Sequence, residues 1–453
     1  MYVIVSHSAA LKDPYCLLSI PENIRGDIKI IVPQETIEKL SHIAYASVDR
    51  KKGISAEYAK TFLKWFNESM GSLSVGFSEI SFLSGSVFSL ALSIKEKGKN
   101  EEVQILTTFD EEKILAKHYE IELFTGIVYD PNAVARHVYS KFPKIEEVDV
   151  PKEVIDNVFS PKVTILPPDF GINNYFPNQC YILKNQRNVA LVIYNAFTNE
   201  LEKVNFPTEA DKNGFGPKNY EQCFHTHCVK SKHRRMVVAF GESGSGKSLG
   251  GMVGAFSQLV LNGNGHKKIG IENSFDEMFG FNQVVIFKGS DPDSETNPGI
   301  LPGNARQKVD HETGSIRDAL EILSRDKDFP FLYERKTDQD ILASLEAVGI
   351  LKFESLAGIT GRSFVGKIVL IEEAQLYSEK MIQVLLRRMG RGTKVLITGD
   401  LLQMGADGYL HDNGLSFIAE KLAYNPYVAF IPFTQSIRSI TSKFCAEAFA
   451  KMF

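Results

Sequence analysis

The stretch VVAFGESGSGKSLGGMVGAF, residues 237–256, decides the fold of the larger part of the chain. Four apolar residues lead into a loop with three glycines and then into a helix-compatible segment, which is the context that a phosphate loop requires. The glycines let backbone N–H groups curl inward toward phosphate oxygens, and the following helix N-terminus adds partial positive charge. The pattern predicts a P-loop nucleotide site.

Within this loop the spacing assigns a role to each polar side chain. Lys247 is expected to reach the β- and γ-phosphates, and Ser248 to ligate Mg²⁺. The alternative is a glycine-rich turn that matches by chance, but both flanking segments also fit. We expect ATP to be contacted by the whole loop and the first helical residues: Gly241, Glu242, Ser243, Gly244, Ser245, Gly246, Lys247, Ser248 and Leu249.

A second buried strand, KIVLIEEAQL at residues 367–376, ends on paired carboxylates. In P-loop nucleotidases an acid at the end of a neighbouring strand holds the Mg²⁺ shell, and the next acid positions the attacking water. Glu372 and Glu373 occupy these two places. The alternative is a pair of solvated glutamates, although the residues before them read as buried on both faces of a sheet.

A third strand, KVLITGDLLQM at residues 394–404, carries Asp400 and Gln403 at its end. These two side chains are candidates to sense the γ-phosphate and to transmit its loss to neighbouring loops. Following the phosphate loop and the paired acids, this element separates helicase-like motor ATPases from P-loop kinases.

Composition limits the remaining classes. A chain of 453 residues with 43% hydrophobic and 23% charged residues predicts two or three ordinary globular domains. The net charge of -4 means that nucleic acid must be contacted through a local basic patch. Five scattered cysteines indicate reduced thiols, no export signal is recognisable, and the longest apolar stretch is too short for a membrane span. We expect a cytoplasmic protein without a membrane partner.

The chain reads as an α/β protein in three parts. Residues 1–130 alternate β-branched runs with helical segments, which predicts an α/β sandwich with a mainly parallel sheet. Residues 131–207 predict a linker and a small β module of antiparallel strands. Residues 208–453 return to α/β alternation and predict a RecA-like P-loop ATPase domain.

These motifs give the chain a family resemblance. Its last part resembles the PhoH family of ATPases, and the whole chain resembles longer members with an N-terminal PIN domain. The resemblance implies an ATPase linked to RNA unwinding, fused to a ribonuclease-type domain, with single-stranded RNA and further copies of the chain, as a hexameric ring, for partners. The matching stretches, in family order, are GPKNYEQ, GESGSGKS, GILPG, LAGITGRSF, IEEAQL, RRMGRGTKVLITGDLLQ, DNGLSFIAEKL and FTQSIRS.

Further site residues follow only from that resemblance. Gln222 matches a glutamine similar to an adenine-reading position, and Arg438 matches an arginine that contacts the γ-phosphate. Arg362 and Arg388 match other family arginines. Two departures stand out: Glu372 replaces an aspartate, and GESGSGKS replaces an alanine-glycine-threonine core. A water-mediated contact to Mg²⁺ accommodates the longer Glu372 side chain.

Assembly is also expected from the residues, because little chain follows QSIRS and a second motor domain is lacking to close the nucleotide site. Another subunit would then supply an arginine, for which Arg387, Arg388 and Arg391 are candidates. A solvated basic turn or a contact to RNA phosphate is the alternative for these three residues. The basic segment KSKHRR, residues 230–235, leaves the same choice between RNA contact and a charged turn.

The segment CFHTHC places Cys223, His225, His227 and Cys228 close together, but its spacing matches no common zinc pattern. On a helix only Cys223 and His227 share a face. We therefore expect a packed helix beside the phosphate loop instead of a metal site.

The N-terminal part resembles a PIN nuclease that has lost part of its site. Such domains gather acids at a sheet edge to hold Mg²⁺ or Mn²⁺, yet Ser6 stands where the first metal aspartate is expected. Glu38 and Asp110 keep two acid positions, with a surface carboxylate as the alternative for each. His7 is a poor Mg²⁺ ligand and would suit only a metal such as Mn²⁺. We expect weak ribonuclease activity or none.

Our leading hypothesis is Mg²⁺-dependent ATP hydrolysis coupled to RNA binding or unwinding. The alternative is a nucleotide-gated RNA-binding or assembly module with little turnover, which Glu372 and the depleted nuclease site suggest. ATPase rates measured with and without single-stranded RNA separate the two.

Overall fold

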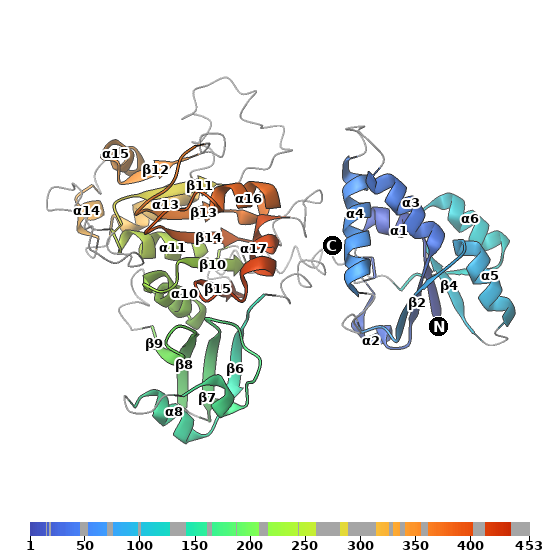
Figure 1. Ribbon diagram of the computed structural model, residues 1–453, viewed down its shortest axis with the longest axis horizontal. Helices are drawn as coiled ribbons and strands as arrows, with labels where there is room; N and C mark the ends of the chain where they lie inside the picture. Colours follow the sequence, from blue (N-terminus) through green and yellow to red (C-terminus); the bar gives the residue numbers. More distant parts are fainter. Residues whose placement is uncertain are drawn as a thin grey trace. The chain divides into compact units, whose positions relative to one another are not determined.

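The computed structural model covers residues 1–453, and most of the chain is described. The description leaves out residues 15, 18–19, 46–52, 70–75, 98–100, 127–141, 161–164, 187, 208–215, 243, 260–280, 289–313, 326–328, 336–339, 355–360, 402–412 and 436–453. The chain divides into two compact units, residues 1–137 and 138–453, and each is treated by itself (Figure 1).

The first unit is a five-stranded parallel sheet with helical crossovers. Its strand order is β3-β2-β1-β4-β5, and all four ladders are parallel. The strands are β1 (Tyr2–Val5), β2 (Lys29–Pro33), β3 (Glu79–Leu83), β4 (Val103–Leu106) and β5 (Glu122–Leu123). The helices are α1 (His7–Lys12), α2 (Glu22–Arg25), α3 (Gln34–Tyr45), α4 (Gly53–Ser69), α5 (Val87–Lys97) and α6 (Asp110–His118). The predicted α/β class is confirmed here.

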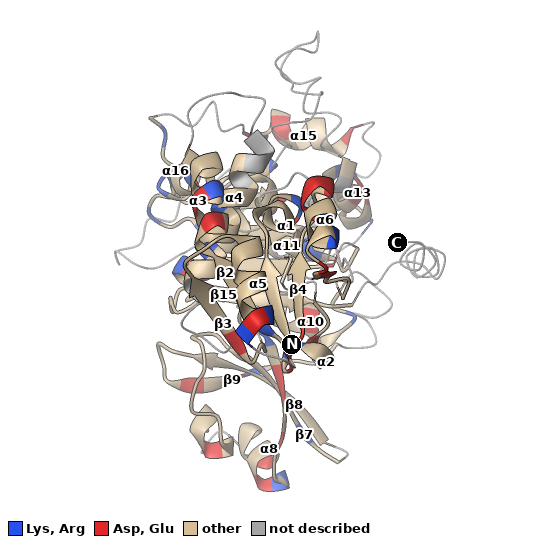
Figure 2. Cartoon of the chain, turned by 90° about the vertical axis from the view of Figure 1, so that its right-hand side faces the viewer, with Lys and Arg blue, Asp and Glu red and all other residues tan. Residues whose placement is uncertain are grey.

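Charge placement favours α6 as a helix. Its first turn holds three acids and its last turn holds Lys117 and His118, so both ends complement the helix dipole (Figure 2). A buried core lies between the sheet and α5. It includes Ile4, Ile31 and Ile105 of the strands and Val87 of the helix.

The second unit begins with a four-stranded sheet of order β6-β7-β8-β9. Its elements are β6 (Ile145–Asp149), α8 (Lys152–Val158), η3 (Pro167–Phe170), β7 (Cys180–Asn185), β8 (Asn188–Asn195) and β9 (Glu200–Val204). The three strands predicted from sequence form two antiparallel pairs, β7 with β8 and β8 with β9. The structure adds β6, which pairs in parallel with β7. Its sequence, IEEVD, is largely charged because it is an edge strand, and this hid it from the apolar pattern.

Side chains that alternate along β7 and β8 join this sheet to the rest of the second unit. Cys180, Ile182, Leu191 and Ile193 belong to the main core, which continues into the P-loop helices. Their neighbours on the opposite face, such as Tyr181 and Leu183, form a smaller core with α8. The β module is therefore part of the second unit, since one of its faces helps to build the core around the P-loop helices.

The rest of the second unit is built on a parallel sheet of six strands in the order β12-β11-β13-β14-β10-β15. The strands are β10 (Met236–Gly241), β11 (Val284–Lys288), β12 (Leu351–Phe353), β13 (Ile368–Glu372), β14 (Lys394–Gly399) and β15 (Val428–Phe433). The helices are α10 (Tyr220–Lys230), α11 (Lys247–Phe256), α13 (Gly314–Leu323), α14 (Pro330–Tyr333), α15 (Ile341–Ala347), η5 (Ala374–Leu376), α16 (Glu379–Leu386) and α17 (Gly414–Leu422). Because β14 separates the phosphate-loop strand from the strand with paired acids, the P-loop ATPase fold predicted from sequence is confirmed.

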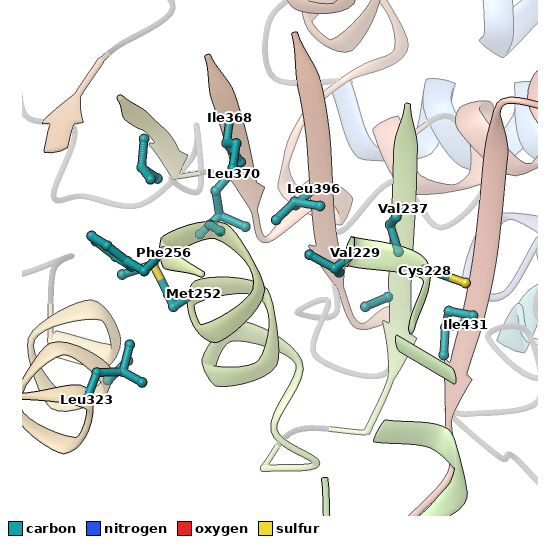
Figure 3. Packing of buried hydrophobic residues seen from close by; sticks show 14 of the residues in the cluster. Cys228, Val229, Val237, Met252, Phe256, Leu323, Ile368, Leu370, Leu396 and Ile431 are labelled. Carbon is teal, nitrogen blue, oxygen red and sulfur yellow. The ribbon is translucent and has the colours of Figure 1, made fainter. Parts of the chain in front are cut away.

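Apolar side chains from both helices and strands fill this core (Figure 3). Val229 of α10 and Met252 and Phe256 of α11 lie on the side of the sheet that carries Leu370 and Leu396, and Leu323 of α13 lies beyond Met252 and Phe256. Within the described residues, no helix is both long enough and apolar enough to cross a membrane.

Candidate functional site

The loop between β10 and α11 has the backbone shape that its glycines permit. Gly241 and Gly246 have φ angles of +118° and +91°, in the left-handed region that glycine tolerates best. A Cβ atom on Gly241 would lie 2.1 Å from the carbonyl oxygen of Phe433, so any other residue would displace β15. The end of β15 is thus a wall against which the loop is built.

Lys247 is the first residue of α11 and is held inside this loop. Its Nζ donates to the carbonyl oxygens of Gly241 and Glu242, each at 2.6 Å. The buried Ser245 donates its hydroxyl to the Glu242 carbonyl at 2.7 Å. The side chains therefore fix the loop from within and place the ammonium where the loop curls. Ser243 lies outside the described residues.

Gln222 connects helix α10 to the same loop. Its Nε2 donates to the Ser245 carbonyl at 3.0 Å, and its Oε1 accepts from the Lys218 N–H at 2.7 Å. Asn219 caps the helix by accepting from the Gln222 N–H. Contact with an adenine base stays a prediction, and it would require the Gln222 amide to exchange one of these partners.

The paired acids lie where β13 ends, with different environments. Glu372 is the last residue of the strand and is buried. Glu373 follows with φ 54° and ψ 49°, a left-handed conformation that is uncommon outside glycine and asparagine. Such backbone strain gathers at functional positions, so the conformation supports a working role for the Glu373 carboxylate.

Gln375 was missed by sequence reasoning and links the two candidate motifs. Its Nε2 donates to the Glu373 Oε2 at 2.7 Å, and its Oε1 accepts from the Asp400 N–H at 3.0 Å. The Gln375 side chain is buried, and its bond to the Asp400 N–H is shielded from water. The quoted EEAQ motif contained this residue, but the sequence did not show that its partner is Asp400, which directly follows β14. Gln403, the other predicted sensor, lies outside the described residues.

The oxygen donors expected for Mg²⁺ share one edge of the sheet. A Cβ on Gly251 would lie 3.6 Å from Leu370 Cδ1, so α11 packs directly on β13. Ser248 lies one turn before that contact and Glu372 two residues after it, which brings both toward the carboxyl-terminal edge. A hydroxyl and a carboxylate are hard oxygen ligands and fit Mg²⁺.

The predicted arginines lie elsewhere. Residues 387–393 pair with the segment before β13, since the N–H groups of Phe364 and Gly366 donate to the carbonyls of Arg388 and Arg391. This turn leads into the amino end of β14, so Arg388 lies at the opposite edge from its own phosphate loop. Arg362 donates to Glu354 at 2.8 Å. A role of Arg388 at the nucleotide stays a prediction for the site of a second chain, and Arg438 lies outside the described residues.

The cysteines and histidines of α10 do not converge. Cys223 and Cys228 belong to the core, while the buried His225 packs on Gly250 of α11. Burial lowers the pKa of His225 to about 4, so its imidazole is neutral at pH 7. His227 instead faces β9. Across the described part of the chain, no group of three His, Cys, Asp or Glu side chains is arranged for a metal ion.

His227 belongs to a polar cluster between α10 and the β module. Glu202 of β9 lies 3.0 Å from His227 Nε2 and 2.8 Å from the buried Arg234. Asn195 also donates to Glu202. Burial opposes ionisation of Glu202, but the bonds to His227 and Arg234 outweigh it and lower its pKa to about 2.

In the first unit, one carboxylate is surrounded by hydroxyl groups at the carboxyl ends of β1 and β4. Ser6 donates to Glu112 Oε2 at 2.5 Å and Ser8 donates to the same oxygen at 3.0 Å. Thr107 also donates to it. His7 Nδ1 lies 3.6 Å from Glu112 Oε1, and burial lowers the pKa of this histidine. Ser6 therefore lies at the carboxyl-terminal edge of the sheet, in a hydroxyl cluster, and its match to a metal-aspartate position stays a prediction.

The two acids predicted for this edge face solvent. Glu38 accepts from Gln34 on the exposed side of α3, and Asp110 pairs with Lys113 at 2.8 Å. The interaction with Lys113 lowers the Asp110 pKa. Glu112, two residues beyond Asp110 in FDEEK, is the acid that reaches the sheet edge. A metal site formed by Glu38 and Asp110 stays a prediction that no described contact supports.

Comparison with known proteins agrees with the geometry of the second unit. The family model for PhoH-like proteins matches residues 215–450, just over half of the chain. The chain belongs to the PhoH-like family. The matched range contains the phosphate loop, the paired acids and Gln375, so the PhoH-like part coincides with the six-stranded sheet and its carboxyl-terminal edge.

Relatives of this PhoH-like chain are distant. Protein PhoH2 of Bacillus subtilis (strain 168) is 25% identical over 278 residues, 60% of this chain and 57% of the relative. A PhoH-like protein of the same organism is 27% identical over 225 residues, 49% of this chain and 60% of the relative. Protein PhoH2 of Mycolicibacterium smegmatis is 26% identical over 157 residues, 35% and 33% of the two chains. The first two matches span about three fifths of the length of those relatives.

Proposed function

We propose that the chain is a Mg²⁺-dependent ATPase that couples hydrolysis to RNA binding or unwinding in an oligomeric ring. In this proposal residues 208–453 are the motor, 131–207 the connecting β module, and 1–130 a PIN-like domain with weak ribonuclease activity or none. The observation that carries it is the convergence of the phosphate loop, Glu372, Glu373 and Asp400 at one edge of a parallel sheet.

Each residue of the site has a separate role in the proposed hydrolysis of ATP. The N–H groups of the loop and the Lys247 ammonium bind the phosphates and neutralise charge that grows as the terminal phosphate leaves. Ser248 and Glu372 would hold Mg²⁺, which would supply positive charge to offset that of the phosphates. Glu373 accepts a hydrogen bond from the attacking water and orients it, while the Gln375 amide fixes the Glu373 carboxylate.

Coupling to RNA begins with the same hydrogen bonds. Gln375 joins Glu373 to the Asp400 backbone, so a shift of the water-bearing carboxylate when phosphate departs is transmitted to β14. The amino end of β14 carries the basic turn at residues 387–393. A movement at the nucleotide edge can thus be transmitted along β14 to the arginines of this turn, which could bind RNA phosphate.

The decisive experiment measures steady-state ATP hydrolysis with and without single-stranded RNA. Lys247→Ala should lose at least nine tenths of the wild-type rate, because the ammonium no longer stabilises phosphate charge. Lys421→Ala, at an exposed lysine of α17, is the matched control and should hydrolyse ATP as wild type does. A Lys247→Ala rate above a tenth of wild type would refute the assignment of the site.

The comparison of hydrolysis rates with and without RNA decides between an RNA-coupled motor and a nucleotide-gated module. Stimulation of turnover by RNA supports the motor. ATP binding with negligible turnover under both conditions would instead support a nucleotide-gated assembly module, the function that the longer Glu372 side chain favours.

A further inference from the structure

The amino-terminal edge of the ATPase sheet is a surface that the nucleotide chemistry does not use. Because all six strands are parallel, the segments before them gather at one edge, and β10 separates this edge from the phosphate loop by roughly 17 Å. We name the amino-edge platform the four segments at residues 196–199, 230–235, 387–393 and 424–427.

Backbone hydrogen bonds join three of these segments side by side. The Val395 N–H donates to the Arg235 carbonyl at 2.8 Å, just after the 387–393 turn. The N–H groups of Arg235 and Met236 in turn donate to the Tyr427 carbonyl. The platform is therefore continuous across β14, β10 and β15.

A buried asparagine locks the platform to the β module. Asn178 has a left-handed backbone, and its Nδ2 donates to the carbonyls of Pro426 and Val428 at 2.8 and 3.0 Å. Its Oδ1 accepts from Arg234 Nε at 2.9 Å, while Arg234 pairs with Glu202. This network is buried, so the segments above it are held rigidly.

The rigid base presents aromatic rings to solvent. Tyr424, Tyr427 and Phe197 are 74%, 47% and 40% exposed. The Phe197 ring lies 4.6 Å from that of Tyr427 and 5.9 Å from that of His233, between ring centroids. Large exposed rings on a well-ordered surface carry an unfavourable contact with water that a partner would remove.

Exposed cations lie on the same platform segments or on neighbouring ones. Lys230, Lys232, Arg387 and Arg391 are exposed on the platform, and its four segments contain no aspartate or glutamate. This is a local positive surface on a chain of net charge -4. Cations beside rings that offer flat faces are the combination by which proteins bind single-stranded nucleic acid without reading its sequence.

We propose that the amino-edge platform binds single-stranded RNA, with bases stacked on Tyr427, Phe197 and Tyr424 and phosphates on the surrounding Lys and Arg side chains. The choice of RNA as the ligand rests on the proposed function, and the new element is the place on the molecule where the RNA binds. It also places Arg387 and Arg391, which are exposed at this edge, among the side chains that contact RNA phosphate. A protein partner is less well matched, because interface centres are depleted of lysine.

Equilibrium binding of a fluorescein-labelled 20-nucleotide oligo(U) RNA, followed by anisotropy at several salt concentrations, tests the platform. Tyr427→Ala should raise the dissociation constant roughly 5- to 150-fold, the loss expected for one stacked base. Arg387→Gln should lower the slope of log affinity against log salt by about 0.7, the value for one phosphate contact on a single strand. Each altered side chain is exposed, and an unchanged thermal midpoint verifies the fold.

Phe159→Ala with Lys203→Gln is the matched control, because it removes an exposed ring and the ammonium 4.2 Å from its centroid elsewhere on the β module. The control should bind RNA as wild type does. Wild-type affinity in both platform variants would overturn the platform and leave the proposed function standing. A wild type that hydrolyses ATP but binds no RNA would overturn the platform together with the RNA part of the proposed function. Crosslinking of the platform to a second copy of the chain, with RNA present, would overturn it as well.

Discussion

At the scale of single residues, Gln375 is the side chain whose contacts have the clearest consequence. It holds the carboxylate of the strained Glu373 and the backbone of Asp400 at the same time. Removing its amide would leave the Glu373 carboxylate without a fixed direction while the phosphate loop stays intact. Gln375 is thus a positioning residue, whose loss affects turnover more than nucleotide binding.

We predict that Gln375→Ala lowers kcat by roughly 10- to 100-fold, the range for losing one hydrogen bond that orients a reacting group. The KM for ATP should change less than threefold, because the phosphates are bound by other groups. Steady-state kinetics measure kcat and KM separately. Gln375→Glu tests whether a second carboxylate beside Glu373 lowers kcat more than removal of the side chain does. An equal rise in KM without loss of kcat would contradict the positioning role.

Glu202 makes a second residue-scale prediction, about pH. Its pKa is about 2 in the folded protein and 4.5 in the reference state, so it contributes stability above pH 4.5 that is lost as the pH falls toward 2. Glu202→Gln should lower the free energy of unfolding by roughly 1 to 3 kcal/mol at pH 7. The difference should shrink at pH 3. Urea unfolding at pH 7 and pH 3 measures this difference in free energy, and the exposed Glu200→Gln is the control. A difference that does not vary with pH would show that ionisation of Glu202 does not contribute to stability.

At the scale of elements, the pair α10 and α11 joins the β module to the phosphate loop. Gly250 and Gly254, one turn apart on α11, face His225 and Val229 of α10. A Cβ on Gly254 would lie 2.2 Å from Val229 Cγ1, so the helices touch where side chains are missing. The glycines after the phosphate loop therefore serve packing, whereas those within it serve the backbone turn.

Gly254→Ala should destabilise the second unit by roughly 1 to 3 kcal/mol, the usual cost of overpacking. Adding Val229→Ala should recover part of that loss, because the opposing methyl groups are gone. Gly314→Ala in α13 is the control: its Cβ meets nothing within 4 Å, so the change should be neutral or stabilising. Urea unfolding of these three variants and of Val229→Ala alone tests the packing, which would be refuted by additive effects of the two substitutions.

The elements also show how far the sequence can be used for prediction. The phosphate loop and the paired acids were predictable because their constraints lie within ten consecutive residues. The contact from Gln375 to Asp400 joins positions 25 apart, and that from Ser6 to Glu112 joins positions 106 apart. Asn178 reaches Val428 across 250 positions. Each of these depends on which strands become neighbours, and a periodic pattern in one strand does not determine that.

At the scale of the whole molecule, both units contain parallel sheets with polar groups at their carboxyl edges. In the second unit this edge carries a lysine, two carboxylates and the helix N-terminus that phosphate requires. In the first unit it carries Glu112, whose Oε2 accepts hydrogen bonds from the Ser6, Ser8 and Thr107 hydroxyls. Hydroxyl donors satisfy a carboxylate without a cation, so this arrangement stabilises the edge in the absence of metal.

We therefore predict that the wild-type first unit cleaves single-stranded RNA weakly or not at all in Mg²⁺ or Mn²⁺. Ser6→Asp should create a site for a divalent cation. Ser6 Oγ lies 2.5 Å from Glu112, so a carboxylate at position 6 would face another carboxylate. Two carboxylates so close either share a proton or take up a divalent cation. The variant should thus gain a thermal midpoint that rises with Mn²⁺, whereas the wild-type midpoint should not.

Two further variants separate the acids of this edge. Asp110→Asn should leave any cleavage unchanged, since Asp110 is exposed and paired with Lys113, whereas Glu112→Gln in the Ser6→Asp background should abolish the Mn²⁺-dependent rise. Strong wild-type cleavage that disappears in Glu112→Gln would contradict the prediction. In that case one carboxylate with three hydroxyl neighbours would be sufficient to activate water, and the serine at position 6 would be a working part of a nuclease.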